Sequence, residues 1–198
     1  MRQLPYSDRC WSALQWSGWP SMTLRQARQE YFDRNGLGDG GYTARWVKFQ
    51  MGPIPFAIPN TEARKKAVKL HDLHHVLTGY GTTWTGEAEI SAWEIASGCR
   101  GYLVAWVINF FAFIIGLVIA PRALYRAFLR GRHSGNFYGV RFQEHLLEKS
   151  VGDARRELRV DQTASPLLSD KLAFAMWAAT PVLIAAVIIA GIYSLLLR

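Results

Sequence analysis

Five residues whose side chains can bind a metal ion lie close together in the sequence. They are His71, Asp72, His74, His75 and Glu87. On an α-helix, which turns by about 100° per residue, His71, Asp72 and His75 share one face. If the next helix runs antiparallel to the first, it brings Glu87 back toward that face. Two imidazoles and two carboxylates suit a divalent ion such as zinc, iron or manganese, so the spacing predicts a metal site.

Two nearby residues are candidates for supporting or catalytic roles. Glu94 shares a helix face with Glu87, where it can orient a histidine ligand. His74 points about 100° away from His75 and is the weakest ligand candidate. If neither is bound to the metal, Glu94 or His74 could transfer a proton. The alternative is a purely structural polar network, which the cost of burying uncompensated imidazoles and carboxylates disfavours.

The pattern His-x-x-His-His also occurs in the histidine boxes of membrane desaturases and hydroxylases, which bind two irons. Those enzymes use several such boxes, whereas this chain has five histidines and no second box. A di-iron oxygenase is therefore a less favoured alternative to a site for a single metal ion.

Helix caps and turn residues predict a mainly α fold around these residues. Thr23 and Gln26 form a capping-box pattern, Asn60 or Thr61 can cap a second helix, and Gly79 ends it. The predicted helices cover 23–34, 61–78, 85–98, 121–132 and 142–160, and a hairpin-like insert of two short strands covers 42–58. Together they form a helical metal-binding domain over 23–160.

Two uncharged runs, 102–120 and 172–197, stand out in a chain that is 50% hydrophobic with a net charge of +8. Each is long enough to cross a bilayer. The second follows a linker over 161–171 and is predicted to be a transmembrane anchor, whereas the first is buried, re-entrant or spanning. Residues 1–22 form a Trp-rich segment with no predicted fold.

The charges and cysteines limit the partners of the chain. The basic segment 122–132 borders an apolar run, which predicts contact with anionic lipid headgroups. No nucleic-acid motif accompanies the charge, so no nucleic-acid partner is expected. Two cysteines, Cys10 and Cys99, exclude a disulfide framework.

The spacing His71-Asp72-x-x-His75, followed by Glu87, resembles the signature of the coenzyme Q (ubiquinone) biosynthesis protein 4 family. The resemblance covers residues 60–160. It continues in the segments Gly86-Glu87, Trp93-Glu94, Gly98, Arg130-Gly-Arg132, Asn136-x-Tyr138, Glu144 and Arg156-Glu157-Leu158.

The resemblance implies a helical, membrane-associated protein that accommodates a lipid and binds a metal, usually zinc, through His71, Asp72, His75 and Glu87. The activity it implies is that of a lyase, which removes the carboxyl group at ring carbon one of a polyprenylated hydroxybenzoate, with or without hydroxylation there. The implied partners are a polyprenylated quinone precursor or another isoprenoid lipid, membrane lipids and other quinone-synthesis proteins. The family is also assigned a scaffolding role, so a non-catalytic lipid-binding scaffold is the alternative. The 42–58 insert and the C-terminal run depart from the family pattern.

This likeness also bears on the topology. It places the residues on both sides of the 102–120 run in one domain, which favours a helix buried in that domain or dipping into one leaflet. Lys171 precedes the C-terminal run and Arg198 is the only charge after it, so we expect the domain on the cytoplasmic side of a bacterial inner membrane or its equivalent.

Overall fold

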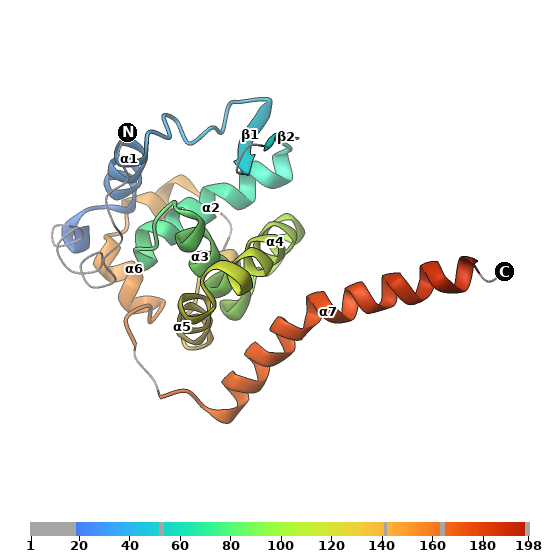
Figure 1. Cartoon of the computed structure of the whole chain (residues 1–198). Coiled ribbons are helices and arrows are strands. Elements are labelled where there is room, and N and C mark those ends of the chain that lie inside the picture. Colours follow the sequence, from blue (N-terminus) through green and yellow to red (C-terminus); the bar gives the residue numbers. More distant parts are fainter. Residues whose placement is uncertain (1–18, 52–53, 141, 163–164, 197–198) are drawn as a thin grey trace.

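A computed structural model describes residues 19–51, 54–140, 142–162 and 165–196. Figure 1 shows a body of packed helices from which one long helix, α7, projects toward the C-terminus. The elements are η1 Trp19–Ser21, α1 Leu24–Asn35, β1 Trp46–Met51, β2 Ile54–Pro59, α2 Glu62–Thr78, α3 Trp84–Ser97, α4 Leu103–Ile119, α5 Pro121–Arg132, η2 Phe137–Gly139, η3 Glu144–Glu148, α6 Val151–Glu157 and α7 Leu168–Leu196. The predicted mainly helical fold with a small antiparallel insert is confirmed.

The caps read from the sequence begin and end the first two long helices. The Thr23 side chain accepts a hydrogen bond from the Gln26 backbone N–H, and the Gln26 side chain accepts one from the Thr23 backbone N–H. These two bonds form the capping box of α1. Thr61 caps α2, and Gly79 ends it in the left-handed conformation. Asn60 does not cap α2, because its side-chain amide donates to backbone carbonyls of the segment before β1.

The insert forms a two-stranded antiparallel sheet. In its register Trp46 lies opposite Pro59 and Met51 lies opposite Ile54. Figure 1 places this hairpin beside the beginning of α2. The metal-binding residues predicted on α2 lie in the second half of that helix, away from the hairpin.

The helix α3 packs between α4 and α5 in the middle of the body. Small residues allow the close approach: a Cβ added at Gly131 of α5 would lie 2.4 Å from the carbonyl oxygen of Trp93. Ala88 and Ala92 of α3 pack with Phe113 of α4 and with side chains of α5 in one buried cluster. This packing fixes the rotation of α3 in the body, and with it the positions of Glu87 and Glu94 on another side of the helix.

Two predictions from the sequence need correction. The segment 142–160 is not one amphipathic helix but η3 followed by α6, because Ser150 caps a new helix and pairs with Thr23. The linker 161–171 is shorter than predicted, because α7 begins at Leu168 and includes Asp170 and Lys171 in its first turn. Most of the Trp-rich 1–22 segment lies outside the described residues.

One helix among the described residues, over Leu168–Leu195, is long and apolar enough to cross a membrane. By length and composition, α7 could therefore be a membrane span. The run 102–120 forms α4, which is shorter and buries one face in the body at Ala105, Asn109, Phe113 and Gly116. The predicted burial in the domain holds for this face of α4, and the re-entrant and spanning arrangements stay predictions.

Candidate metal centre

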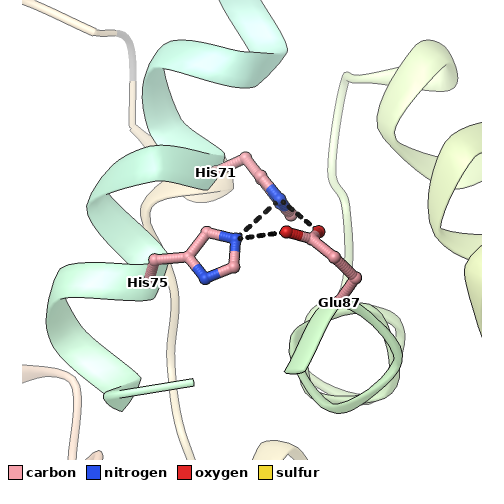
Figure 2. A group of neighbouring side chains, drawn as sticks. All are labelled: His71, His75 and Glu87. Atoms are coloured by element: carbon pink, nitrogen blue, oxygen red, sulfur yellow. Dashed lines mark hydrogen bonds and ion pairs between the residues drawn. The ribbon is translucent and has the colours of Figure 1, made fainter. Parts of the chain in front are cut away.

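Three of the four predicted ligands come together in space. The ligand atoms of His71, His75 and Glu87 all lie within 4.8 Å of one another. In the described part of the chain, no other group of three or more His, Cys, Asp or Glu side chains comes together in this way. Figure 2 shows the two imidazoles on successive turns of α2 pointing at the carboxylate, which approaches from α3. The spacing of four residues on α2 puts both imidazoles on one face, and Glu87 is brought to them from the next helix, as predicted. Figure 2 shows α3 end-on where α2 runs across the view, so α3 crosses α2 instead of running antiparallel to it.

The hydrogen bonds of the two histidines fix their tautomers. Nδ1 of His71 lies 2.9 Å from Oε1 of Glu94, and Nδ1 of His75 lies 2.9 Å from the carbonyl oxygen of Tyr80. A carboxylate and a carbonyl only accept hydrogen bonds, so both Nδ1 atoms carry the proton. When both rings are neutral, both Nε2 atoms carry the lone pair that binds a metal, in the arrangement typical of histidine ligands.

These two Nε2 atoms face each other at 3.1 Å. Two lone pairs at this distance repel unless a cation, either a proton or a metal ion, lies with them. Burial opposes a charge on His71, but Glu94 and Glu87 raise its pKa well above the ordinary value. The pocket between the rings therefore favours a positive charge.

The distances also fit a metal ion. Each oxygen of Glu87 lies 3.6 Å from one Nε2 atom, Oε1 from that of His75 and Oε2 from that of His71. Zinc–nitrogen bonds of about 2.0–2.1 Å at tetrahedral angles separate two ligand atoms by about 3.3 Å. Two imidazoles and one carboxylate are a complete set of protein ligands for a catalytic site, which keeps one position open.

The site opens toward solvent on the side of Glu87. That side chain is 37% exposed, whereas the side chain of His75 is 1% exposed and stacks on Tyr31 with ring centroids 5.2 Å apart. Burial alone would raise the pKa of Glu87, but the imidazoles of His75 and His71 hold this pKa below its ordinary value. Glu87 is thus the ionised ligand at the accessible edge.

The fourth predicted ligand, Asp72, lies outside this group. Its Oδ2 accepts a hydrogen bond from the hydroxyl of Tyr42 at 2.5 Å, and burial raises its pKa to about 6. Tyr42 belongs to the segment that leads into β1, so the Asp72 carboxylate is held by that segment. A ligand role for Asp72 stays a prediction from the sequence motif.

Glu94 orients the ligand His71 through a hydrogen bond to its Nδ1 atom, which is the role predicted from the sequence. It is fully buried, and its two oxygens accept four hydrogen bonds. The donors are His71, His74, Asn109 and Tyr138. Burial alone would raise its pKa, but the two histidines hold the pKa of Glu94 well below its ordinary value.

His74 belongs to the same support. Its Nδ1 donates to Glu94, and its Nε2 accepts the backbone N–H of Phe137 at 2.9 Å. Both ring nitrogens are occupied inside the protein, and the side chain is completely buried. The proton-transfer role predicted for His74 and Glu94 stays untested, but the geometry gives both a positioning role.

Sequence reasoning missed three groups that complete the site. Asn109 and Tyr138 hold Glu94, and the carbonyl of Tyr80 orients His75. Asn109 is the single amide in the uncharged run 102–120, which is a signal that could have pointed to an inward polar contact. The remaining histidines are elsewhere: His133 contacts Asp170 at the base of α7, and His145 is exposed.

Comparison with protein-family models, with curated proteins and with solved structures finds no match to the chain. The likeness to the ubiquinone-biosynthesis family therefore stays a prediction that depends on the motif residues.

Proposed function

We propose that this protein is a membrane-anchored, metal-dependent decarboxylase of ubiquinone biosynthesis that acts on a polyprenylated hydroxybenzoate. The observation that carries the proposal is the cluster of His71, His75 and Glu87, whose facing Nε2 atoms and accessible carboxylate can hold one divalent ion. The sequence motif that contains these residues supports the choice of substrate, and α7 supports attachment to the membrane.

The residues present fit the proposed ion and the proposed substrate. His71, His75 and Glu87 would hold the ion, which when bound supplies Lewis acidity toward the substrate. Two neutral imidazoles and one carboxylate sum to a charge of −1, so a divalent ion and these three ligands together carry a net +1 at the open edge, while the charge of Glu94 is buried behind His71, at its Nδ1 atom. A benzoate carboxylate or phenolate is attracted to such a centre.

The reaction needs no redox partner. The bond between ring carbon one and the carboxyl carbon breaks, carbon dioxide leaves, and the electron pair stays on the ring carbon. A proton from a water molecule at the open edge of the site then takes the place of the carboxyl group, and the hydroxide left takes up a proton from solvent. Glu94 and His74 keep the His71 ring in one orientation throughout, and the open edge at Glu87 admits the substrate.

Bound metal is the first test. The full chain, purified in detergent, should contain about one divalent ion per molecule, and His75→Ala and Glu87→Ala should each lose it. The exposed His145→Ala is the matched control and should keep it. Unchanged metal content in both ligand variants would refute the site. Zinc is the expected ion, and anaerobic purification tests iron and manganese, because two histidines and one carboxylate also form iron(II) sites.

The substrate is tested separately. A strain that lacks the protein should accumulate a carboxylated, prenylated precursor detectable by mass spectrometry of its lipids. The pure protein should decarboxylate that precursor, and Glu87→Ala should abolish the turnover. A normal lipid profile in the deletion strain would contradict the assignment.

A second function, a non-catalytic lipid-binding scaffold for quinone-synthesis enzymes, is favoured by one observation. Every polar atom of Glu94 and His74 is engaged inside the protein, so neither is a free acid or base. The metal would then join α2 to α3. This function predicts that Glu87→Ala lowers thermal stability while capture of partner proteins survives, and that no turnover is measurable.

A further inference from the structure

The outward face of α4 is apolar where a helix at a protein surface is normally polar. Four large side chains along it are 48–80% exposed. They are Leu103, Val107, Phe111 and Val118. At about 100° per residue these four lie within about 80° of arc, opposite the buried face of the same helix. We call these four residues the outer face of α4.

Arginines flank this outer face at both ends. Arg100 precedes α4, and Arg122 and Arg126 follow it on α5, and all three are exposed. None of the three forms an ion pair with any residue that the structure describes. The other two arginines of the basic segment face inward: Arg130 donates to the carbonyls of Thr78 and Val160, and Arg132 donates to Asp170.

The base of α7 is fixed beside α4. Asp170, buried in the first turn of α7, accepts hydrogen bonds from Arg132 at 3.1 Å and His133 at 3.0 Å. Two turns further along α7, Trp177 stacks on Trp106 of α4, with ring centroids 5.7 Å apart and planes 6° from parallel. The position of α7 therefore determines the position of α4 relative to any membrane that α7 crosses.

The length of α7 beyond the Trp106–Trp177 contact indicates where this contact lies relative to a bilayer. Ala173, Phe174 and Trp177 of α7 pack on the body in one hydrophobic cluster, and Trp177 is the last of the three along the helix. The 19 residues from 178 to 196 extend about 28 Å at 1.5 Å per residue, close to the hydrocarbon thickness of about 30 Å. If these residues span the bilayer, the Trp106–Trp177 pair lies at its boundary, where tryptophan is enriched in membrane proteins.

We propose that the outer face of α4 lies in the acyl boundary of the same leaflet that α7 enters, with Arg100, Arg122 and Arg126 against anionic phospholipid headgroups. An apolar helix face with arginines at its ends has the composition of a helix that lies in the membrane interface. The body would then be seated on the membrane by two elements, one that spans and one that lies in the surface. This inference rests on the membrane insertion included in the proposed function, but not on the metal or the substrate.

Spin labels on the full chain test the proposal. In a Cys10→Ser background, in which Cys99 stays buried, single cysteines replace Val107, Phe111, Val187 of α7, or Glu157 of α6. Each labelled protein is reconstituted into vesicles of phosphatidylcholine and phosphatidylglycerol. Frequent collisions of the spin label with dissolved oxygen indicate that the label lies in lipid, and frequent collisions with a water-soluble nickel chelate indicate that it lies in water. Equal melting temperatures verify that the labels leave the fold intact.

The expected result is an oxygen-to-nickel ratio at 107 and 111 that is several-fold above that at 157 and similar to that at 187. A ratio at 107 and 111 equal to that at 157, with 187 still in lipid, would overturn the inference and leave the anchor in place. An aqueous ratio at 187 would instead refute the anchor itself. Spin–spin broadening at 107 or 111 would show a second copy on this face and would also overturn the inference.

Discussion

At the scale of single residues, Glu94 controls the orientation of the metal-binding histidines. It holds His71 directly and also binds His74, and it receives Asn109 from α4 and Tyr138 from η2. Three separate segments of the chain are thus tied to one buried carboxylate. A partner of this kind fixes the tautomer of a ligand and increases its basicity.

Replacement of this carboxylate by its neutral isostere should weaken the site. In Glu94→Gln the amide nitrogen cannot accept hydrogen bonds, so two of the four donors lose their acceptor. We expect zinc affinity to fall about 10- to 100-fold, measured by competition with a chromogenic chelator. Glu62→Gln, at an exposed position on α2, is the control and should bind zinc normally. Unaltered affinity in Glu94→Gln would show that the carboxylate does not act on the ligand.

The pKa of His71 predicts how metal binding depends on pH. Because the carboxylates raise this pKa well above the ordinary value, the ring holds a proton near neutral pH that the metal must displace. Zinc affinity should therefore fall as the pH decreases below the raised pKa of His71, by about tenfold per pH unit for one displaced proton. Isothermal titration in two buffers of different ionisation enthalpy measures that proton. Release of no proton would contradict the assigned protonation of His71.

At the scale of elements, the turn between α2 and α3 is as important as the ligands. It supplies the Tyr80 carbonyl to His75 and begins the helix that carries Glu87. A Cβ added at Gly86 would lie 2.2 Å from the carbonyl oxygen of Gly81, so this part of the chain has no space for a side chain. This close contact packs the turn against the first turn of α3, which carries Glu87.

Gly86→Ala should therefore damage the metal centre without removing a ligand. The clash is with backbone, so the turn must move, and overpacking of this kind costs about 1–3 kcal/mol. We expect a lower melting temperature together with reduced zinc content. Gly139→Ala, where nothing lies within 4 Å of the added Cβ, is the matched control and should change stability by less than about 0.5 kcal/mol. Equal behaviour of the two variants would mean that the turn is free to adapt.

At the scale of the whole molecule, the chain consists of a packed helical body and one projecting helix. The 18-residue window that makes α7 a candidate span is not buried at all in the body, unlike an apolar helix in the core of a soluble protein. Its base is nevertheless held by the buried carboxylate of Asp170. The body and the projecting helix are therefore joined through a defined contact.

Charges placed in the middle of α7 should release the protein from membranes. Each lysine at the centre of a span costs about 2.5–3.5 kcal/mol on insertion scales, so Ile184→Lys combined with Ile188→Lys removes much of the driving force. The double variant should leave the membrane fraction during alkaline carbonate extraction, whereas the unmodified chain stays. Leu168→Lys, at the exposed base of the helix, should also stay. Retention of the double variant would show that α7 is not the anchor.

The sequence alone determined the features that depend on local chemistry. Caps at Thr23 and Thr61 and the stop at Gly79 specify helix ends, because they involve residues within one turn. The period of the α-helix places His71 and His75 on one face, and the return of α3 brings Glu87 to them. The apolar composition of α7 was likewise visible without any fold.

Only the tertiary structure decided the features that need distant segments. The hydroxyl of Tyr42 binds Asp72, which lies outside the ligand cluster. Asn109 of the apolar helix α4 donates a hydrogen bond to Glu94. The pairing of Ser150 with Thr23 divides a segment that reads as one amphipathic helix. A local pattern shows which face of a helix is apolar or polar, but which partner covers that face depends on packing between residues far apart in the chain. For this reason the metal-binding histidines and Glu94 were predicted, whereas Asn109, Tyr138 and the carbonyl of Tyr80 were not.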